Sequence, residues 1–499
     1  MVSCISAKLW FISGVLYIGL TMPHTVSMYF PNNAQESMEA YLRQSILPDN
    51  STLTDGSMDQ MWSLFISQVF LGNMIGGFLM VPLADKLGRR KTLLMMILVK
   101  LPGNVLQFLA KPLNLWIFLY LGRLWEMIAL GITDLTLQVF VCEISTPQTR
   151  GSLGSFASIS ISVGALLSVT LGLDEILGSS TLWPFGFVAT LPLSLLAFLL
   201  LIWIPESPVF LVSSSTKHIE LKQSLLFYHG SDQNLSSVIA DNSVKCSSRR
   251  PVCPSIFALL GRSQLRKPVL IAVVLSLIRS AGFRYAMHIF TLTVYQEQCF
   301  SSSIAAYTTG MFHETGYTEH KAQLTTVILF GVGLIAALLC MVTVDRVGRR
   351  ALLLSSVCGT SFCWLAITVA AKLPVPLSQT KMTTVTVCLF ASQLLSTIGI
   401  RSLVPVIVPE IFPYRFRASG RSLARMVTSL TQILVSYVFW PLFRYSQSTA
   451  FGILGVVLLV SLVFLVPCFP ETKNKQPSEI FAPENVKLTD QNENKTLHC

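Results

Sequence analysis

The chain has 499 residues, of which 52% are hydrophobic and 12% are charged, and its mean hydropathy is +0.61. Soluble domains carry about 25% charged residues, so this composition excludes an ordinary soluble protein and predicts an integral membrane protein in contact with lipid. The formal net charge of +11 is therefore expected to reflect Lys and Arg on cytoplasmic loops, and we expect no nucleic-acid partner.

Twelve segments of the chain are long and apolar enough to cross a bilayer, which takes about 20 mostly apolar residues. Only one Lys precedes the first segment, so we expect a membrane span there rather than a removable signal peptide. The segments of the first half cover residues 9–28, 61–83, 92–110, 113–141, 151–173 and 182–204. Those of the second half cover residues 268–294, 322–344, 351–371, 382–408, 420–444 and 450–469. The predicted fold class is an all-α membrane protein with twelve transmembrane helices.

Polar stretches divide the chain into four predicted regions. They are an N-terminal six-helix bundle (1–205), a cytoplasmic linker with short helices (206–267), a C-terminal six-helix bundle (268–470) and a cytoplasmic disordered tail (471–499). Within the linker, residues 220–226 combine helix-forming residues with an apolar side, which favours a short helix. A plain linker without helices is the alternative.

The distribution of charge over the loops predicts the orientation of the chain. The loop 29–60 contains Arg43 as its one basic residue against five acidic residues, whereas alternate loops are rich in Lys and Arg. By the positive-inside rule, both termini are expected to be cytoplasmic. A glycosylation sequon begins at Asn50, in a loop that this orientation places outside. We therefore expect a multi-pass glycoprotein, with the plasma membrane as its location.

One charged motif occurs twice, each time on a short link between two apolar segments. The first copy runs from Asp85 to Arg90 and the second from Asp345 to Arg350, a separation of 345 − 85 = 260 residues. A repeat at about half the chain length indicates two similar halves, and many transporters build a substrate path between two such halves. The sequence contains no P-loop and no catalytic or metal-binding constellation, so we expect no enzyme activity, no cofactor and no metal site.

Further motifs occur in a fixed order around this repeat. They are Gly122-Arg123, Pro205-Glu206-Ser207-Pro208, Arg266-Lys267-Pro268, Pro409-Glu410-Ile411-Phe412 and Pro470-Glu471-Thr472-Lys473. With these motifs the chain resembles a sugar porter of the major facilitator superfamily and is similar to the facilitative glucose transporters over nearly its whole length. The resemblance implies two pseudo-symmetric six-helix bundles that give a small-molecule solute access to each side of the membrane in turn.

Charged residues at the predicted cytoplasmic ends of the spans form a candidate gate. Guanidinium groups there can bridge helix C-terminal carbonyls and nearby carboxylates, and individually weak ion pairs suit a reversible contact. The alternative is that these charges only anchor helix ends and set the topology. The gate residues are Asp85, Arg89, Arg90, Arg123, Glu143, Arg150, Glu206, Asp345, Arg349, Arg350, Glu410, Arg417 and Glu471.

The positions that the resemblance assigns to substrate binding depart from the family pattern. In the family, sugar hydroxyls are held mainly by Gln, Asn, Glu and Trp side chains. Here Ser158 and Arg279 stand where the family has Gln, and Pro405 stands where it has Trp. The candidate substrate-binding residues are Ser158, Arg279, Ser280, Tyr285, Thr397, Arg401, Pro405 and Thr428.

Two of these replacements are arginines, which changes the expected substrate. Guanidinium groups bind carboxylates in a bidentate manner, so Arg279 and Arg401 favour a small organic anion or an acidified sugar over glucose. The alternative is that Arg279 pairs with Asp134 or another carboxylate and only holds helices together. We expect Arg421 and Arg425 to extend the cytoplasmic gate from the start of the span 420–444.

Coupling to protons is not expected from the first span. Proton-coupled relatives carry an Asp there, whereas this span has no carboxylate and its titratable residue is His24, which we expect to be an ordinary hydrogen-bonded residue at the helix end. We therefore predict a uniporter driven by the gradient of its solute. The alternative function is a non-transporting nutrient sensor on the same scaffold, although the short tail after residue 474 favours transport. The sequence carries no signal for an oligomeric state.

Overall fold

The computed structural model describes residues 2–46, 55–145, 150–212, 218–229, 318–372, 379–404, 407 and 417–468. Regular structure in these ranges is helical throughout, with no strand among them. Eight of the described helices are long and apolar enough to cross a membrane. The predicted span 268–294, most of the linker and the tail lie outside the described residues.

The first half contains a continuous series of helices. Its first span is a helix that is interrupted by a π-helical turn, η1 (Tyr17–Thr21), and continues with Pro23 in its first turn. Further on, the short helices α9 and α10 follow the last span of this half. The helices are α1 (Val2–Leu16), α2 (Met22–Tyr29), α3 (Gln35–Ile46), α4 (Asp55–Leu87), α5 (Arg89–Leu109), α6 (Trp116–Ile144), α7 (Arg150–Leu171), α8 (Leu191–Trp203), α9 (Pro208–Val212) and α10 (His218–His229).

The described part of the second half contains five long helices. They are α16 (Glu319–Val347), α17 (Arg349–Lys372), α18 (Gln379–Ser396) with its π-helical extension η7 (Thr397–Arg401), α20 (Arg417–Tyr445) and α21 (Gln447–Cys468). Each predicted span except 268–294 therefore coincides with a described helix or pair of helical segments. The helix at residues 220–226 lies within α10, as predicted.

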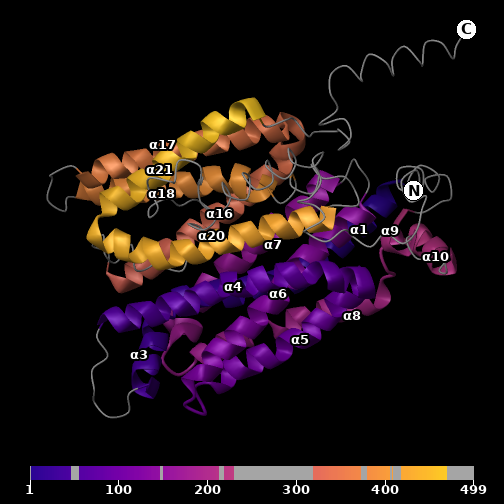
Figure 1. Cartoon of the computed structure of the whole chain (residues 1–499), viewed down its shortest axis with the longest axis horizontal. Helices are drawn as coiled ribbons and strands as arrows, with labels where there is room; N and C mark the ends of the chain where they lie inside the picture. Colours follow the sequence, from indigo (N-terminus) through magenta and orange to yellow (C-terminus); the bar gives the residue numbers. More distant parts are fainter. Residues whose placement is uncertain are drawn as a thin grey trace, which may run out of the picture.

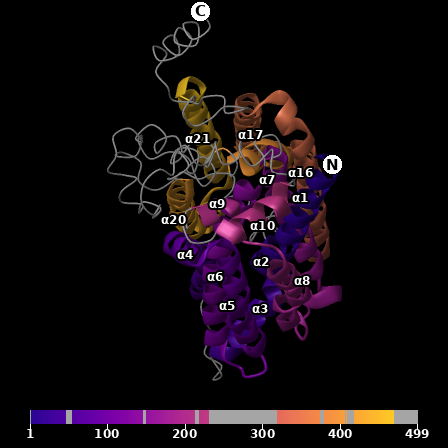
Figure 2. The same ribbon diagram turned by 90° about the vertical axis from the view of Figure 1, so that its right-hand side faces the viewer.

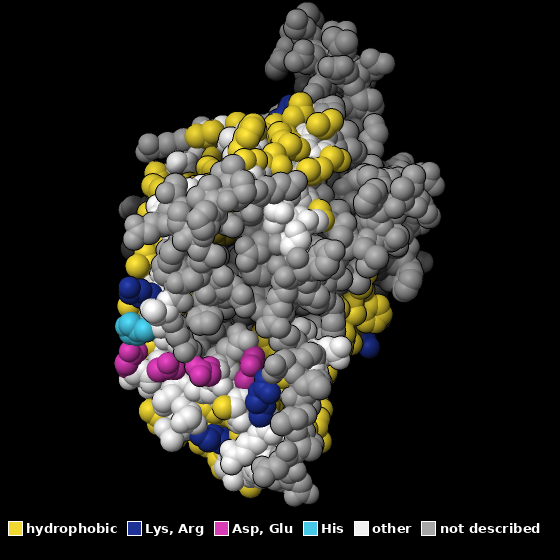
Figure 3. All heavy atoms as spheres, turned by 90° about the vertical axis from the view of Figure 1, so that its left-hand side faces the viewer, with side chains coloured by type: hydrophobic (Ala, Val, Ile, Leu, Met, Phe, Trp, Pro, Cys, Tyr) yellow, Lys and Arg dark blue, Asp and Glu magenta, His cyan; other side chains and the backbone are white. Residues whose placement is uncertain are grey.

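The two halves form two layers of roughly parallel helices, with the indigo to magenta half below the orange to yellow half in Figure 1. Seen from the end in Figure 2, α9 and α10 lie over the ends of the first-half helices. Contacts between the layers join α20 to α4 and α6, and α16 to α7. The opposite end, on the side of α3, carries a row of acidic side chains with a histidine at its edge (Figure 3). His320 Nδ1 lies 3.4 Å from Glu175 Oε1, and both side chains are exposed.

The burial pattern is that of a membrane protein. On α8, apolar side chains point outward, among them Leu195, Leu199 and Trp203. Charged side chains lie inside instead, and Arg123 and Glu126 on α6 are fully buried. Since lipid tails are as apolar as leucine, polar groups at membrane depth turn towards partners or cavities. The buried charges therefore mark the places where function is to be sought.

The repeated motif produces the same local structure twice. Gly88 separates α4 from α5 with a φ of 90°, and Gly348 separates α16 from α17 with a φ of 95°. Only glycine adopts such angles without strain. A Cβ atom on Gly88 would also lie 2.5 Å from Glu206 Oε2. The prediction of two similar halves is thus matched by two equivalent breaks between long helices.

Candidate functional site

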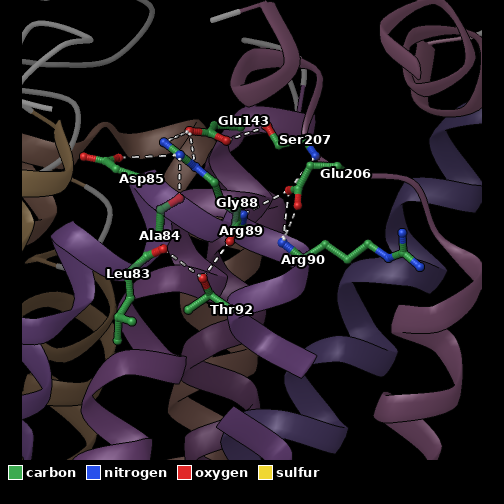
Figure 4. A network of polar contacts seen from close by, with 10 residues as sticks. All are labelled: Leu83, Ala84, Asp85, Gly88, Arg89, Arg90, Thr92, Glu143, Glu206 and Ser207. Carbon is green, nitrogen blue, oxygen red and sulfur yellow. Dashed lines mark hydrogen bonds and ion pairs between the residues drawn. The ribbon is translucent and has the colours of Figure 1, made fainter. Parts of the chain in front are cut away.

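Arg89 lies at the centre of a polar network at the α4–α5 link (Figure 4). Its Nη2 atom lies 3.0 Å from Glu143 Oε1, and its Nε atom donates to the same oxygen at 3.2 Å. Asp85, one turn earlier, lies 3.7 Å away. The other oxygen of Glu143 accepts a hydrogen bond from Ser207 at 2.5 Å. We call Asp85, Arg89, Glu143, Glu206 and Ser207 the Arg89 cluster.

Glu206 binds the beginning of α5 rather than an arginine side chain. Its carboxylate accepts the backbone N–H groups of Arg89 and Arg90, both at 3.0 Å. The first N–H groups of a helix have no partner within the helix and carry partial positive charge, so an anion there is stabilised. The Arg90 side chain turns to the end of α8 and donates to the carbonyls of Leu201 at 2.6 Å and Ile202 at 2.7 Å.

The second half repeats this arrangement in part. Arg350 donates to the carbonyl of Val466, in the last turn of α21, at 2.7 Å, as Arg90 does at the end of α8. Arg349 is buried like its counterpart Arg89. Arg150 and Arg417 begin α7 and α20. The described part of the chain does not include Glu410, Glu471 or the side chains of Arg150, Asp345 and Arg417.

The linker helix α10 is fastened to the same region. Ser224 donates to the carbonyl of Glu206 at 2.6 Å, and the Tyr228 hydroxyl donates to that of Pro205 at 2.8 Å. Burial raises the pKa of Tyr228 and lowers the pKa of His229 beside it, because the charged form of each would lose its hydration. The described contacts of the Arg89 cluster thus join α4, α5, α6 and the segment after α8 within the first half.

Arg123 does not belong to this network, so its placement in the cytoplasmic gate was wrong. It precedes Glu143 by 20 residues on the same helix, which is about 30 Å at 1.5 Å per residue. Its guanidinium donates instead to the carbonyls of Phe65 at 3.1 Å and of Ser27 and Met28 at 3.3 Å each. The Gly122-Arg123 motif does not show how far Arg123 lies from the cytoplasmic end of its helix. The continuous helix α6 gives that distance.

A small cavity lies between the two halves. Its volume is about 60 Å³, which is room for about two water molecules. Two predicted substrate-binding residues, Arg401 and Thr428, line it from the second half. The lining residues are Thr21, Thr25, Met28, Tyr29, Phe70, Asn73, Leu130, Asp134, Ile161, Arg401, Arg425, Thr428 and Gln432.

The other predicted substrate residues divide into two groups. Ser158 lies half-buried on α7 and Thr397 lies buried in η7, and neither is among the described lining residues of the cavity. Arg279, Ser280, Tyr285, Pro405 and the sequon residue Asn50 lie outside the described residues.

Arg421 and Arg425 join the two halves at this cavity. Arg425 Nη2 donates to Asn73 Oδ1 at 2.8 Å, and its Nη1 atom lies 3.7 Å from Asp134 Oδ2. Gln138 donates to Asp134 Oδ1 at 3.0 Å and accepts a hydrogen bond from Arg421. We call these five residues the interhalf latch. The expectation that the two arginines extend the cytoplasmic gate stays a prediction; their described contacts are with α4 and α6 of the first half.

Sequence reasoning missed the uncharged members of this site. Asn73 and Gln138 interrupt the apolar faces of α4 and α6, and Gln432 is buried on α20. An amide side chain at membrane depth is costly unless it is hydrogen-bonded. Amide residues within apolar segments could therefore have indicated this site from the sequence. The alternative that Arg279 pairs with Asp134 lies outside the described residues; among these, Asp134 faces Arg425 and accepts a hydrogen bond from Gln138.

Comparison with known proteins identifies the family. The sequence model of the family described as "Sugar (and other) transporter" matches residues 1–481. The chain belongs to this sugar transporter family. It is 26% identical to the facilitated glucose transporter member 2 of Gallus gallus, over 92% of this chain and 82% of that protein. It is also 26% identical to member 4 of Homo sapiens, over 87% of this chain and 81% of that protein.

A solved structure gives the fold. The proton:xylose symporter XylE, bound to 6-bromo-6-deoxy-D-glucose, superposes with a TM-score of 0.77 at 18% identity and covers 95% of this chain and 98% of its own. The chain is therefore an all-α membrane protein with the twelve-helix architecture of the major facilitator superfamily. Members of this family transport solutes and are not enzymes.

Proposed function

We propose that this sugar transporter family member is a facilitative, alternating-access uniporter whose solute is a sugar-like molecule carrying an anionic group. One observation carries the proposal: two arginines, Arg401 and Arg425, line the cavity between the halves. A neutral hexose needs groups that both donate and accept hydrogen bonds, whereas guanidinium groups only donate. An anionic oxygen matches such donors better than a hydroxyl does.

The charges around the cavity support this substrate class. Arg425 is paired with Asp134, whereas no hydrogen bond or ion pair joins Arg401 to another residue of the described part. The described lining residues therefore carry one positive charge in excess, on Arg401, which is 6% exposed. A charge at membrane depth costs about 3 kcal/mol by the insertion scales, and a bound anion offsets part of that cost.

Transport requires the walls of the cavity to move apart. The cavity lies between the halves, so we expect the solute to reach it when the halves separate. The interhalf latch crosses between α20 and the first half, and its contacts have to break in that step. We assign the reversible closure on the cytoplasmic side to the Arg89 cluster together with its second-half counterpart around Arg349 and Arg350.

Uptake into proteoliposomes tests the proposal with a matched pair of solutes. D-glucose and D-glucuronate differ only at C6, which is a hydroxymethyl group in the first and a carboxylate in the second. Counterflow in vesicles that are preloaded with the same solute requires no driving ion. We expect counterflow of the uronate to exceed that of the hexose, and Arg401→Gln to reduce the uronate signal at least tenfold. Glucose counterflow equal to or above that of glucuronate, or an unaffected Arg401→Gln variant, would contradict the anionic substrate.

A sensor that does not transport is the second candidate, and the same preparation distinguishes it. A sensor binds solute, which raises its thermal unfolding temperature, but shows no counterflow of any solute. The likeness to glucose transporters over most of their length favours transport. We also propose a plasma-membrane location with both termini in the cytoplasm, supported by the few basic residues in the loop 29–60.

A further inference from the structure

A second group of buried charges lies in the first half, beside the cavity and apart from the latch. It consists of His24 and Ser27 on α2, Lys100 and Gln107 on α5, and Glu126 on α6, and we call it the Glu126 cluster. The side chains of Glu126, Lys100 and His24 are 0%, 2% and 4% exposed. A lysine and a glutamate at membrane depth are costly to keep, so their presence points to a role beyond packing.

The two oxygens of Glu126 have different surroundings. Oε2 accepts hydrogen bonds from Ser27 at 2.6 Å and from Gln107 at 2.9 Å. Oε1 lies 3.8 Å from Lys100 Nζ and 3.9 Å from His24 Nδ1, distances that are too long for hydrogen bonds. None of these three atoms has a hydrogen-bond partner in the described structure. Glu126, Lys100 and His24 thus lie close together, and no hydrogen bond between them fixes which one carries a proton.

The charge of the cluster can change by one proton. The charged or titratable groups that face Glu126 are His24 from α2, Lys100 from α5 and Arg123 from α6 itself, while α4 contributes the backbone carbonyl of Phe65 to Arg123. With Lys100 and Arg123 protonated, Glu126 ionised and His24 neutral, the sum is +1. Loss of one proton makes the whole cluster neutral, and a neutral cluster is favoured inside a membrane. The attraction between Lys100 and Glu126 instead favours the protonated lysine. The two effects on the Lys100 proton therefore oppose each other.

We propose that the Glu126 cluster is a proton-binding site and that its occupancy sets the rate at which the transporter changes conformation. A solvent proton adds to the Lys100 amine, beside Glu126 Oε1, and leaves to solvent in the reverse step. No other bond forms or breaks. The effect on rate rests on the proposed transport, whereas the proton site itself does not, and neither requires an anionic solute.

The position of the cluster connects it to the moving parts. On α2, His24 and Ser27 adjoin Thr25 and Met28, which line the cavity. On α6, the cavity residues Leu130 and Asp134 follow Glu126 by one and two helical turns. A proton that changes how firmly α5 holds α2 and α6 therefore changes the wall against which α20 closes.

The first test measures solute counterflow at equal pH on both sides of the vesicle, from pH 5.5 to 8.5. We expect the rate of the unaltered protein to change at least threefold through a single one-proton step. Lys100→Met and Glu126→Gln are expected to lose the step, whereas Lys91→Met, the same substitution at an exposed position of α5, retains it. A flat profile for the unaltered protein, or an unchanged step in folded Lys100→Met and Glu126→Gln proteins, would overturn the proposal.

A second test needs no transport substrate. Arg stays protonated over the whole pH range, so the purified Lys100→Arg variant is expected to take up one proton per chain fewer than the unaltered protein between pH 8.5 and pH 5.5. Equal proton uptake by the two proteins would show that the cluster does not titrate. Absence of counterflow together with a one-proton difference would refute transport while leaving the proton site in place.

Discussion

Removal of the Arg425 charge is the most direct test of the interhalf latch. Arg425→Gln loses the ion pair with Asp134 and the charge-assisted bond to Asn73. A hydrogen bond to a charged group contributes about 1.5–3 kcal/mol. The Arg425 side chain is 15% exposed and its ion pair is 3.7 Å long, so we take about 2 kcal/mol for both contacts together. Because both contacts cross between the halves, this loss favours the separated state about 30-fold.

Reagent access to the cavity reports this shift. Thr428 lines the cavity, so Thr428→Cys in a background without the other cysteines places a thiol there. The labelling rate with a membrane-impermeant maleimide then follows the population in which the halves have separated. We expect Arg425→Gln to raise this rate by about 30-fold and Asp134→Asn to raise it less, since the bond from Arg425 to Asn73 remains.

A double-mutant cycle and one control variant show whether the contact itself is responsible. The combined Asp134→Asn and Arg425→Gln protein is expected to label no faster than Arg425→Gln alone, because the pair is already broken. Arg401→Gln, on the same cavity but without a described contact to the first half, should leave the rate unchanged. An unchanged rate in Arg425→Gln, or effects of the two single substitutions that simply add, would refute the latch.

Three further outcomes are expected. Gly88→Ala is expected to destabilise the protein by about 1–3 kcal/mol, because Gly88 has a φ of 90° and an added Cβ would meet Glu206. Gly14→Ala serves as the control, since the nearest atom to its added Cβ is 3.7 Å away. Equal unfolding temperatures of the two variants would contradict this expectation. Burial lowers the pKa of His229, so the folded state binds fewer protons than the unfolded state, and the attachment of α10 should weaken as pH falls below about 6.5. Protease cleavage within α10 is expected to accelerate at pH 5.5 relative to pH 7.5, and His229→Gln to remove the difference. Asn50→Gln should abolish a glycosidase-sensitive shift in electrophoretic mobility if the loop 29–60 lies outside.

Much of the fold was predictable because the bilayer imposes a length on each span. The described helices follow the apolar segments, and the two copies of the Asp-to-Arg motif predicted two equivalent helix breaks, at Gly88 and Gly348. Helix boundaries were less predictable: α4 extends several residues beyond its apolar segment at both ends, whereas α6 begins and ends three residues later than the segment 113–141. Polar residues continue a helix wherever the backbone hydrogen bonds continue, so hydropathy alone does not fix where a helix begins and ends.

The candidate site was predictable only in part, because sequence gives neither the depth nor the partner of a charged residue. Arg401 and Thr428 were predicted to bind the substrate, and both line the cavity between the halves. Arg425 was predicted only to extend the gate, yet it lines the same cavity, about 12 Å along α20 from Arg417. The partners of Arg421 and Arg425 also stand about 280 and 290 residues away in the chain, where no local pattern connects them.

The three carboxylates of α6 each lie near a cation from another part of the molecule. Glu126, Asp134 and Glu143 are 8 and 9 residues apart, which is about 12 and 14 Å along the helix, and each faces a cation from another helix. Lys100 and Arg89, both on α5, lie beside Glu126 and Glu143, respectively. Arg425 on α20 lies beside Asp134. When the halves separate, the two outer contacts remain within the first half and the middle one breaks. In the alternating access proposed above, Asp134 is thus the carboxylate of α6 whose contact joins the halves, whereas Glu126 and Glu143 act within the first half.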